Sequence, residues 1–284
     1  MILLLRMLLL VFVFIQISTS FVSAQVYGNE WIKYDQKYYS FPVVNSGLKR
    51  INYADLESAG IPVATINHNQ LQIFGKKREV PLWIETNGDN TFDQGDYILF
   101  YAERNDGWLD STLYVDPTKM ANHTISLVTD TLLYFLTWSS STNNRRFTPE
   151  YATDYLNYTP TSYVWSMVEQ GYTEAYHEGE KLESGLSSSF YVAGEGYGKT
   201  HVNGVNGYNL DITAATPLPY TSGPDAKFRG LVTTTASAPV LSNTDPNHHT
   251  RWIINGQTVY DATGKGCIQF KAETNFSTAG MTNT

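Results

Sequence analysis

Asp96-Tyr97-Ile98-Leu99-Phe100-Tyr101 is the stretch of sequence that decides the fold. Its apolar and aromatic side chains follow one another almost without interruption, which is typical of a strand covered on both faces. We expect it to be a central strand. Shorter runs of the same kind lie on either side, at 38–44, 71–75, 80–84, 112–115, 124–128 and 132–136. Because Gly, Asn and Asp turns separate these runs, the sequence predicts a β-sandwich over residues 25–140.

One short helix is expected within this first sandwich. Asn52 can cap its first turn, and Asp55 follows at the third helical position, where a carboxylate faces the positive end of the helix dipole. Gly60 can end the helix in a left-handed conformation, and Pro62 prevents its continuation. These signals agree on a helix of about two turns after Asn52.

A polar stretch at 139–149 predicts a loop, and we expect a linker over residues 141–184 with a second short helix at 163–169. A second β-region is expected over 185–284, with strands near 190–192, 209–212, 228–232 and 251–254. Asn255-Gly256 predicts a tight hairpin, since both residues tolerate positive φ. The predicted fold class is therefore all-β, with two sandwich or jelly-roll-like domains and one or two short helices. We expect the second sandwich to be incomplete at Thr284.

The first 24 residues have the pattern of an export signal. Arg6 precedes an apolar run over 7–17, and Val22-Ser23-Ala24 offers the small residues that signal peptidase reads. The mature chain would then begin at Gln25 and be exported to the periplasm, the outer-membrane surface or the medium. No later apolar run approaches the roughly 18 residues of a membrane span, so we expect no transmembrane segment after signal removal.

Composition excludes one class of partner and one kind of cross-link. The net charge of −8 argues against nucleic acid, because phosphate backbones require clustered Lys and Arg. Cys267 is the single cysteine, so no internal disulfide can form. An ordinary hydrophobic core, or a metal, must hold the chain together.

The acidic stretch over 87–96 is the best candidate site. Asp89, Asp93 and Asp96, with the carbonyl of Asn87 or Asn90, could supply the oxygen ligands that Ca²⁺ prefers. The terminal Glu of a helix-loop-helix calcium site is missing. Asp and Asn side chains also accept hydrogen bonds from nearby backbone in ordinary turns. A calcium site and a solvated turn both stay open at this point, with the turn favoured.

Cys267 and the histidines offer weaker candidates. Cys267 follows a Gly-Lys-Gly turn and enters an expected strand, where cysteine is usually a small core residue rather than a nucleophile. His177 lacks a second histidine four residues later, so the helical zinc-peptidase motif is absent. His248 and His249 would point to opposite faces of a strand and could not easily share one metal. We therefore expect no catalytic residue within this chain.

Four stretches together resemble the N-terminal region of gingipain-like cysteine peptidases, a family that includes the sortase of the type IX secretion system. They are 31–56, 92–101 with Asn105-Asp106-Gly107 and Leu113-Tyr114, Gly194-Glu195-Gly196-Tyr197, and Asn247-His248-His249 with Ile254-Asn255-Gly256. The resemblance implies β-rich modules that precede a catalytic domain containing a Cys–His pair. The family's His-Gly context occurs at none of the six histidines here, so the nucleophile role is not carried over to Cys267.

The resemblance implies a non-catalytic N-terminal fragment of an exported peptidase or sortase. Such a fragment would support or shield a downstream catalytic domain, its main expected partner, and could meet type IX secretion components at the outer membrane. The alternative is an exported carbohydrate-binding or cell-envelope structural β-module, because Tyr and Trp are plentiful and could stack on sugar rings.

Overall fold

The computed structural model describes residues 28–182, 184–200, 208–213, 218–234, 246–279 and 281. The expected signal peptide over 1–24 and the expected mature start at Gln25 lie outside this part. Several antiparallel sheets dominate the described chain, and α2 (Tyr53–Ser58) is the one α-helix found there, which confirms the all-β prediction. None of the helices in the described part is long and apolar enough to span a bilayer.

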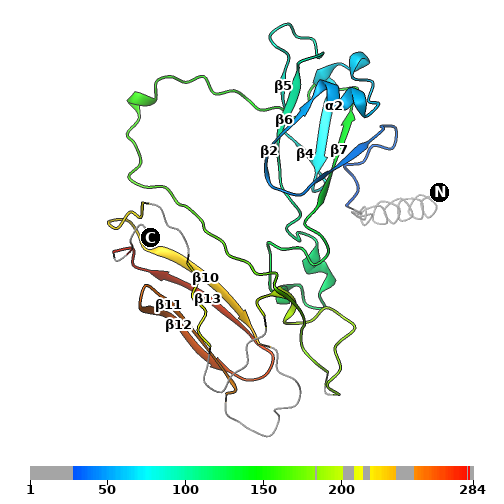
Figure 1. The fold of residues 1–284 in the computed structure, drawn as a ribbon. Coiled ribbons are helices and arrows are strands. Elements are labelled where there is room, and N and C mark those ends of the chain that lie inside the picture. Colours follow the sequence, from blue (N-terminus) through cyan, green and yellow to red (C-terminus); the bar gives the residue numbers. More distant parts are fainter. Residues whose placement is uncertain are drawn as a thin grey trace, which may run out of the picture. The chain divides into compact units, whose positions relative to one another are not determined.

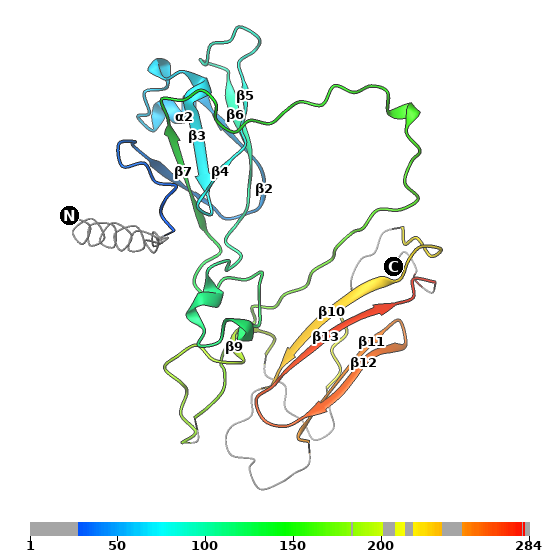
Figure 2. The same ribbon diagram turned by 180° about the vertical axis from the view of Figure 1, so that it is seen from behind.

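The chain forms two compact units, and neither is one continuous segment. The first comprises the described residues of 1–41, 49–100 and 134–147, and the second those of 42–48, 101–133 and 148–284. This division differs in detail from the expected sequence of sandwich, linker and sandwich. In particular, strand β8 (Ala175–Glu178) lies inside the expected 141–184 linker and pairs with β9 (Glu195–Gly198), which Figure 2 labels.

Two sheets make up most of the first unit (Figure 1). One has the order β1 (Tyr39–Val43), β7 (Leu132–Trp138), β3 (Leu71–Gly75) and β4 (Arg78–Val80), and the other has β2 (Gly47–Asn52), β6 (Tyr97–Ala102) and β5 (Trp83–Glu85). The Phe41 ring of β1 lies 5.9 Å from that of Phe100 in β6 and 6.0 Å from that of Tyr134 in β7. The two sheets therefore share an aromatic core, and β6 is central in its sheet as the sequence predicts.

Helix α2 follows the predicted capping scheme. The Asn52 amide donates to the Asp55 carboxylate at 3.1 Å, so the third helical residue reaches back to the start of the helix. At the other end Gly60 has φ +74°, and the Ile61 amide donates to the Leu56 carbonyl at 3.1 Å. This is a left-handed glycine termination, as expected.

Five 3₁₀ turns join the strands of the described chain. They are η2 (Val63–Thr65), η3 (His68–Gln70), η4 (Asp110–Leu113), η5 (Pro117–Lys119) and η6 (Tyr155–Asn157). The position of η4 shows that the strand predicted at 112–115 is wrong.

The strand predicted at 124–128 is also wrong, because side chains bind its backbone. Asn122 Oδ1 accepts the amides of Thr124 and Ile125, and Asp110 Oδ2 accepts the amide of Leu127 at 2.7 Å. These bonds take donors that a sheet would need.

Four further strand and helix predictions need correction. The strand expected at 80–84 is split between β4 and β5, which belong to different sheets. No strand forms at 190–192 or 209–212, and 163–169 contains no helix. Val164 and Met167 are among the large side chains exposed there, so the segment has no apolar face that packing could stabilise as a helix.

The second unit contains two long ribbons. β10 (Ala226–Thr233) pairs with β13 (Gln269–Phe276), and β11 (His248–Ile254) pairs with β12 (Gln257–Gly264). Asn255 and Gly256 have φ +47° and +82°, which confirms the predicted hairpin. The Phe228 and Trp252 rings lie 5.0 Å apart, and Gly230 leaves room for the Trp252 ring. The ribbons therefore pack on each other through one aromatic pair.

The polar stretch after β7 is part of the first unit and not a free linker. The amide of Leu82 donates to the Arg145 carbonyl, and the amide of Phe147 donates to the Leu82 carbonyl at 3.0 Å. Arg146 is half-buried, and its Nη2 donates to the carbonyls of His68, Asn69 and Leu71 at 3.2, 2.8 and 3.1 Å. One guanidinium thus joins this stretch to the start of β3.

Replacing Arg146 by Met should lower the free energy of unfolding by about 1–3 kcal/mol, because carbonyls of residues 68–71 lose a charged donor. The adjacent Arg145→Met is the matched control: Arg145 is exposed, and a change below about 0.5 kcal/mol is expected. Urea unfolding of both variants measures the difference. Equal midpoints for the two variants would contradict the role given to Arg146.

Candidate binding pocket

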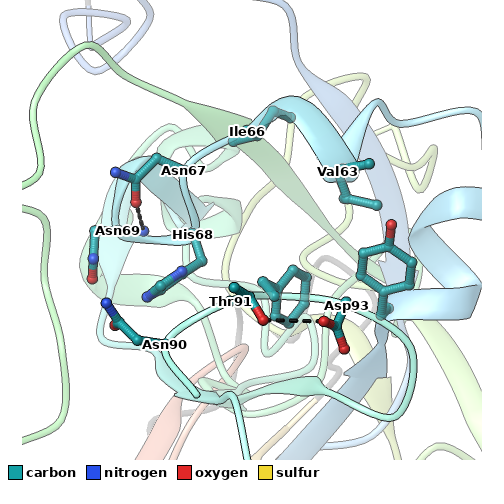
Figure 3. Close-up of a pocket in the computed structure, with 11 residues that line it drawn as sticks. Val63, Ile66, Asn67, His68, Asn69, Asn90, Thr91 and Asp93 are labelled. Atoms are coloured by element: carbon teal, nitrogen blue, oxygen red, sulfur yellow. Dashed lines mark hydrogen bonds between the residues drawn. The ribbon is translucent and has the colours of Figure 1, made fainter. Parts of the chain in front are cut away.

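A pocket of about 390 Å³ opens in the first unit (Figure 3). One wall is the segment that contains η2 and η3, and the other is formed by residues 90–93. Tyr53, Val63 and Phe92 line it with side chains that are almost fully buried. Asn67, His68, Asn69 and Asn90 gather at one end in Figure 3, and Asp93 lies at the other.

Asp96 fixes the wall made by the acidic loop. Its side chain is only 1% exposed; Oδ1 accepts Asn87 Nδ2 at 2.6 Å, and Oδ2 accepts the Asp93 amide at 2.8 Å. Its backbone carbonyl accepts the amide of Tyr53, the first residue of α2, at 2.9 Å. One residue therefore closes the loop and attaches it to the helix.

The other two predicted calcium ligands lie in an exposed turn. Asp89 Oδ1 accepts the Thr91 amide at 2.9 Å, and the Thr91 hydroxyl lies within hydrogen-bond distance of both Asp89 and Asp93. The Thr91 amide, with a smaller effect from its hydroxyl, lowers the pKa of the Asp89 carboxyl below its usual value. These are the bonds of an ordinary Asx turn.

Calcium binding by Asp89, Asp93 and Asp96 stays a prediction. Both oxygens of Asp96 already accept hydrogen bonds within the loop. Within the described ranges, no three or more His, Cys, Asp or Glu side chains form a group that could hold a metal ion. The contacts present are those of the turn interpretation.

The opposite wall is fixed by Asn67 and Arg146. Asn67 Oδ1 accepts the Asn69 amide at 2.9 Å and so caps η3 (Figure 3). Arg146 Nη2 donates hydrogen bonds to the backbone carbonyls of His68 and Asn69. Burial lowers the pKa of His68, and the nearby Arg146 cation acts in the same direction, so the imidazole is neutral at physiological pH.

Cys267 lies in the second unit in an environment that keeps its thiol protonated. It is half-buried, and its sulfur lies 3.5 Å from the carbonyl of Ala193. Burial, assisted by the carboxylate of Glu180, raises the pKa of the thiol to about 11. An activated cysteine needs the opposite shift, toward a stable thiolate.

The two adjacent histidines of β11 have different environments, as their strand position predicts. His248 is half-buried, and its Nε2 is shielded from solvent without a hydrogen-bond partner in the described chain; burial lowers its pKa. His249 is exposed and pairs with Asp261 at 2.6 Å, and Asp261 also accepts Arg251 at 2.7 Å. The two imidazoles therefore lie on opposite faces of the ribbon.

Sequence reasoning missed the polar end of the pocket. The run Asn67-His68-Asn69-Gln70 contains a local signal, since Asn67 can cap a short helical turn. Nothing local indicates that this run faces residues 90–93, because the two walls come from different parts of the chain. Comparison of the chain with protein-family models, curated proteins and solved structures gives no match.

Asp96→Asn should destabilise the protein by about 1–3 kcal/mol, because one acceptor oxygen is replaced by a donor that faces another donor. Asp89→Asn is the matched control in the same loop, and we expect a much smaller change since Asp89 is exposed. Thermal unfolding of both variants is the measurement. A loss at Asp89 as large as that at Asp96 would refute the assignment of Asp96 as the residue that closes the loop.

Proposed function

We propose that the chain is a non-catalytic N-terminal module of an exported gingipain-like cysteine peptidase or type IX secretion sortase. Its role is to support or shield a catalytic domain downstream. Type IX secretion components at the outer membrane are further partners under this proposal. The support comes from the four resembling stretches, from the all-β architecture, and above all from the state of the lone thiol.

The chemistry of Cys267 is the observation that carries the proposal. A cysteine peptidase attacks with a thiolate that a nearby imidazolium or helix N-terminus stabilises. With a pKa of about 11, the thiolate of Cys267 amounts to roughly one molecule in ten thousand at pH 7. Burial is the main cause of this raised pKa, and the carboxylate of Glu180 adds to it because it disfavours a second negative charge. Cys267 is suited to packing and not to attack.

The packing around Cys267 supports the same conclusion. A side chain at Gly194 would lie 3.5 Å from the Cys267 sulfur and only 3.0 Å from Thr233. Gly194 therefore packs closely against the thiol on one side. Cys267 lies just before β13 begins at Gln269, so the residues around it pack within the second unit.

The mature chain from Gln25 should hydrolyse no labelled casein above the buffer rate, and Cys267→Ser should behave in the same way. The chain should bind the separately produced catalytic domain of a gingipain-like peptidase and raise its melting temperature. Calorimetry and thermal unfolding measure this effect. The catalytic domain alone, with its thiol blocked, provides the control.

Two outcomes would overturn the proposal. The first is hydrolysis by the chain alone that disappears in Cys267→Ser. The second is that the catalytic domain, added in large molar excess, neither binds the chain nor gains a higher melting temperature.

A further inference from the structure

We propose that the pocket of the first unit binds a neutral polyhydroxylated ligand, a single sugar unit, through the amides of Asn67, Asn69 and Asn90 and the imidazole of His68. This site is separate from the proposed supporting role, and the test of one does not decide the other. The aromatic residues involved are not the exposed Tyr and Trp side chains that the sequence suggests. They are the buried Tyr53 and Phe92, which line the pocket.

The side chains at the polar end of the pocket have donors and acceptors that make no hydrogen bond within the described chain. Asn67 uses its Oδ1 to cap η3, which leaves its NH₂ group available. The side-chain amides of Asn69 and Asn90 and the ring of His68 make no hydrogen bond to another described residue. Each amide has donors and an acceptor, and a neutral imidazole has one of each. A pair of neighbouring sugar hydroxyls, each able to donate and accept, matches this set.

The charge around the pocket disfavours an anion. No Lys or Arg is among the described residues that line it, and the Nη2 of Arg146 donates to backbone carbonyls of residues 68–71. Asp93, which lines the pocket, is the residue there with a carboxylate, and its Oδ2 lies 3.0 Å from the Thr91 hydroxyl. A phosphate or carboxylate ligand would meet this negative charge directly, whereas the Arg146 cation lies outside the lining. The lining is therefore suited to uncharged polar groups.

The size of the pocket fits the same class of ligand. A volume of about 390 Å³ lies at the low end of the range of roughly 300–1,000 Å³ for small-molecule sites. Tyr53 and Phe92 lie edge to face with their centroids 5.5 Å apart, and Val63 adds aliphatic surface. Because these three side chains are almost fully buried, they expose only narrow apolar strips to a ligand, and the amides supply most of the contacts.

The walls are held in place without a ligand, which reduces the ordering cost of binding. Asp96 fixes residues 87–96, and Arg146 with the Asn67 cap fixes residues 67–71. Asn90 has φ +63°, so its amide is presented from a left-handed position. Glycine is the natural replacement there, because it keeps this backbone conformation and removes the side chain.

Saturation-transfer NMR with the mature chain tests the site. The probes are glucose, galactose, mannose and N-acetylglucosamine, with glucose 6-phosphate as the charged comparison. At least one neutral sugar should bind, more tightly than the phosphate ester. Asn69→Ala and Asn90→Gly should each weaken that binding about fivefold or more, since each removes hydrogen bonds worth roughly 1 kcal/mol.

Asn143→Ala is the matched control, because Asn143 is an exposed asparagine of the same unit and does not line the pocket. Its sugar binding should equal that of the unchanged chain. Three results would overturn the proposal: no neutral sugar binds, glucose 6-phosphate binds best, or Asn69→Ala and Asn90→Gly bind as Asn143→Ala does. If Asn90→Gly does not fold, as judged by circular dichroism, the Asn69→Ala result decides alone.

Discussion

A charge taken out of water must be hydrogen-bonded, and the first unit depends on this constraint at Asp96 and Arg146. The Asp96 carboxylate binds one backbone amide and one side-chain amide of its own loop, and its carbonyl binds the start of α2. The Arg146 guanidinium binds the carbonyls at the start of β3. The hydrogen bonds of each charged group fix one wall of the pocket. The shape of the pocket therefore depends on both groups having hydrogen-bond partners within the protein.

Neither group forms an ion pair with another residue that the structure describes, whereas charged side chains of the second unit do. Arg229 and Glu273 lie 2.9 Å apart, but both side chains are more than two-thirds exposed, and such pairs contribute little. The second unit depends instead on the Phe228–Trp252 contact and on the hairpin at Asn255-Gly256.

Elements with local causes could be predicted from the sequence. α2 has its cap and its glycine within nine residues, β3 matches its apolar run, and the hairpin is set by two adjacent residues. The failures have distant causes. Residues 124–128 look like a strand, but Asp110 binds their backbone from outside the segment. The stretch after β7 looks like a linker, yet Arg146 reaches carbonyls some 75 residues away in sequence.

The candidate site also contains residues that the sequence makes recognisable and residues that it does not. Asp89, Asp93 and Asp96 stand out in the sequence because they cluster, but burial separates Asp96 from the other two. Asn67, His68 and Asn69 do not stand out, because their significance depends on residues 90–93 facing them.

Amide hydrogen exchange measured by NMR on the unchanged protein tests the central claim most directly. The Asp93 amide is bonded to the buried Asp96 carboxylate, whereas the Thr91 amide is bonded to the exposed Asp89. We expect Asp93 to exchange at least about tenfold more slowly than Thr91, although both lie in one loop. Equal exchange at the two amides would contradict the account, because Asp96 would then not be holding the loop.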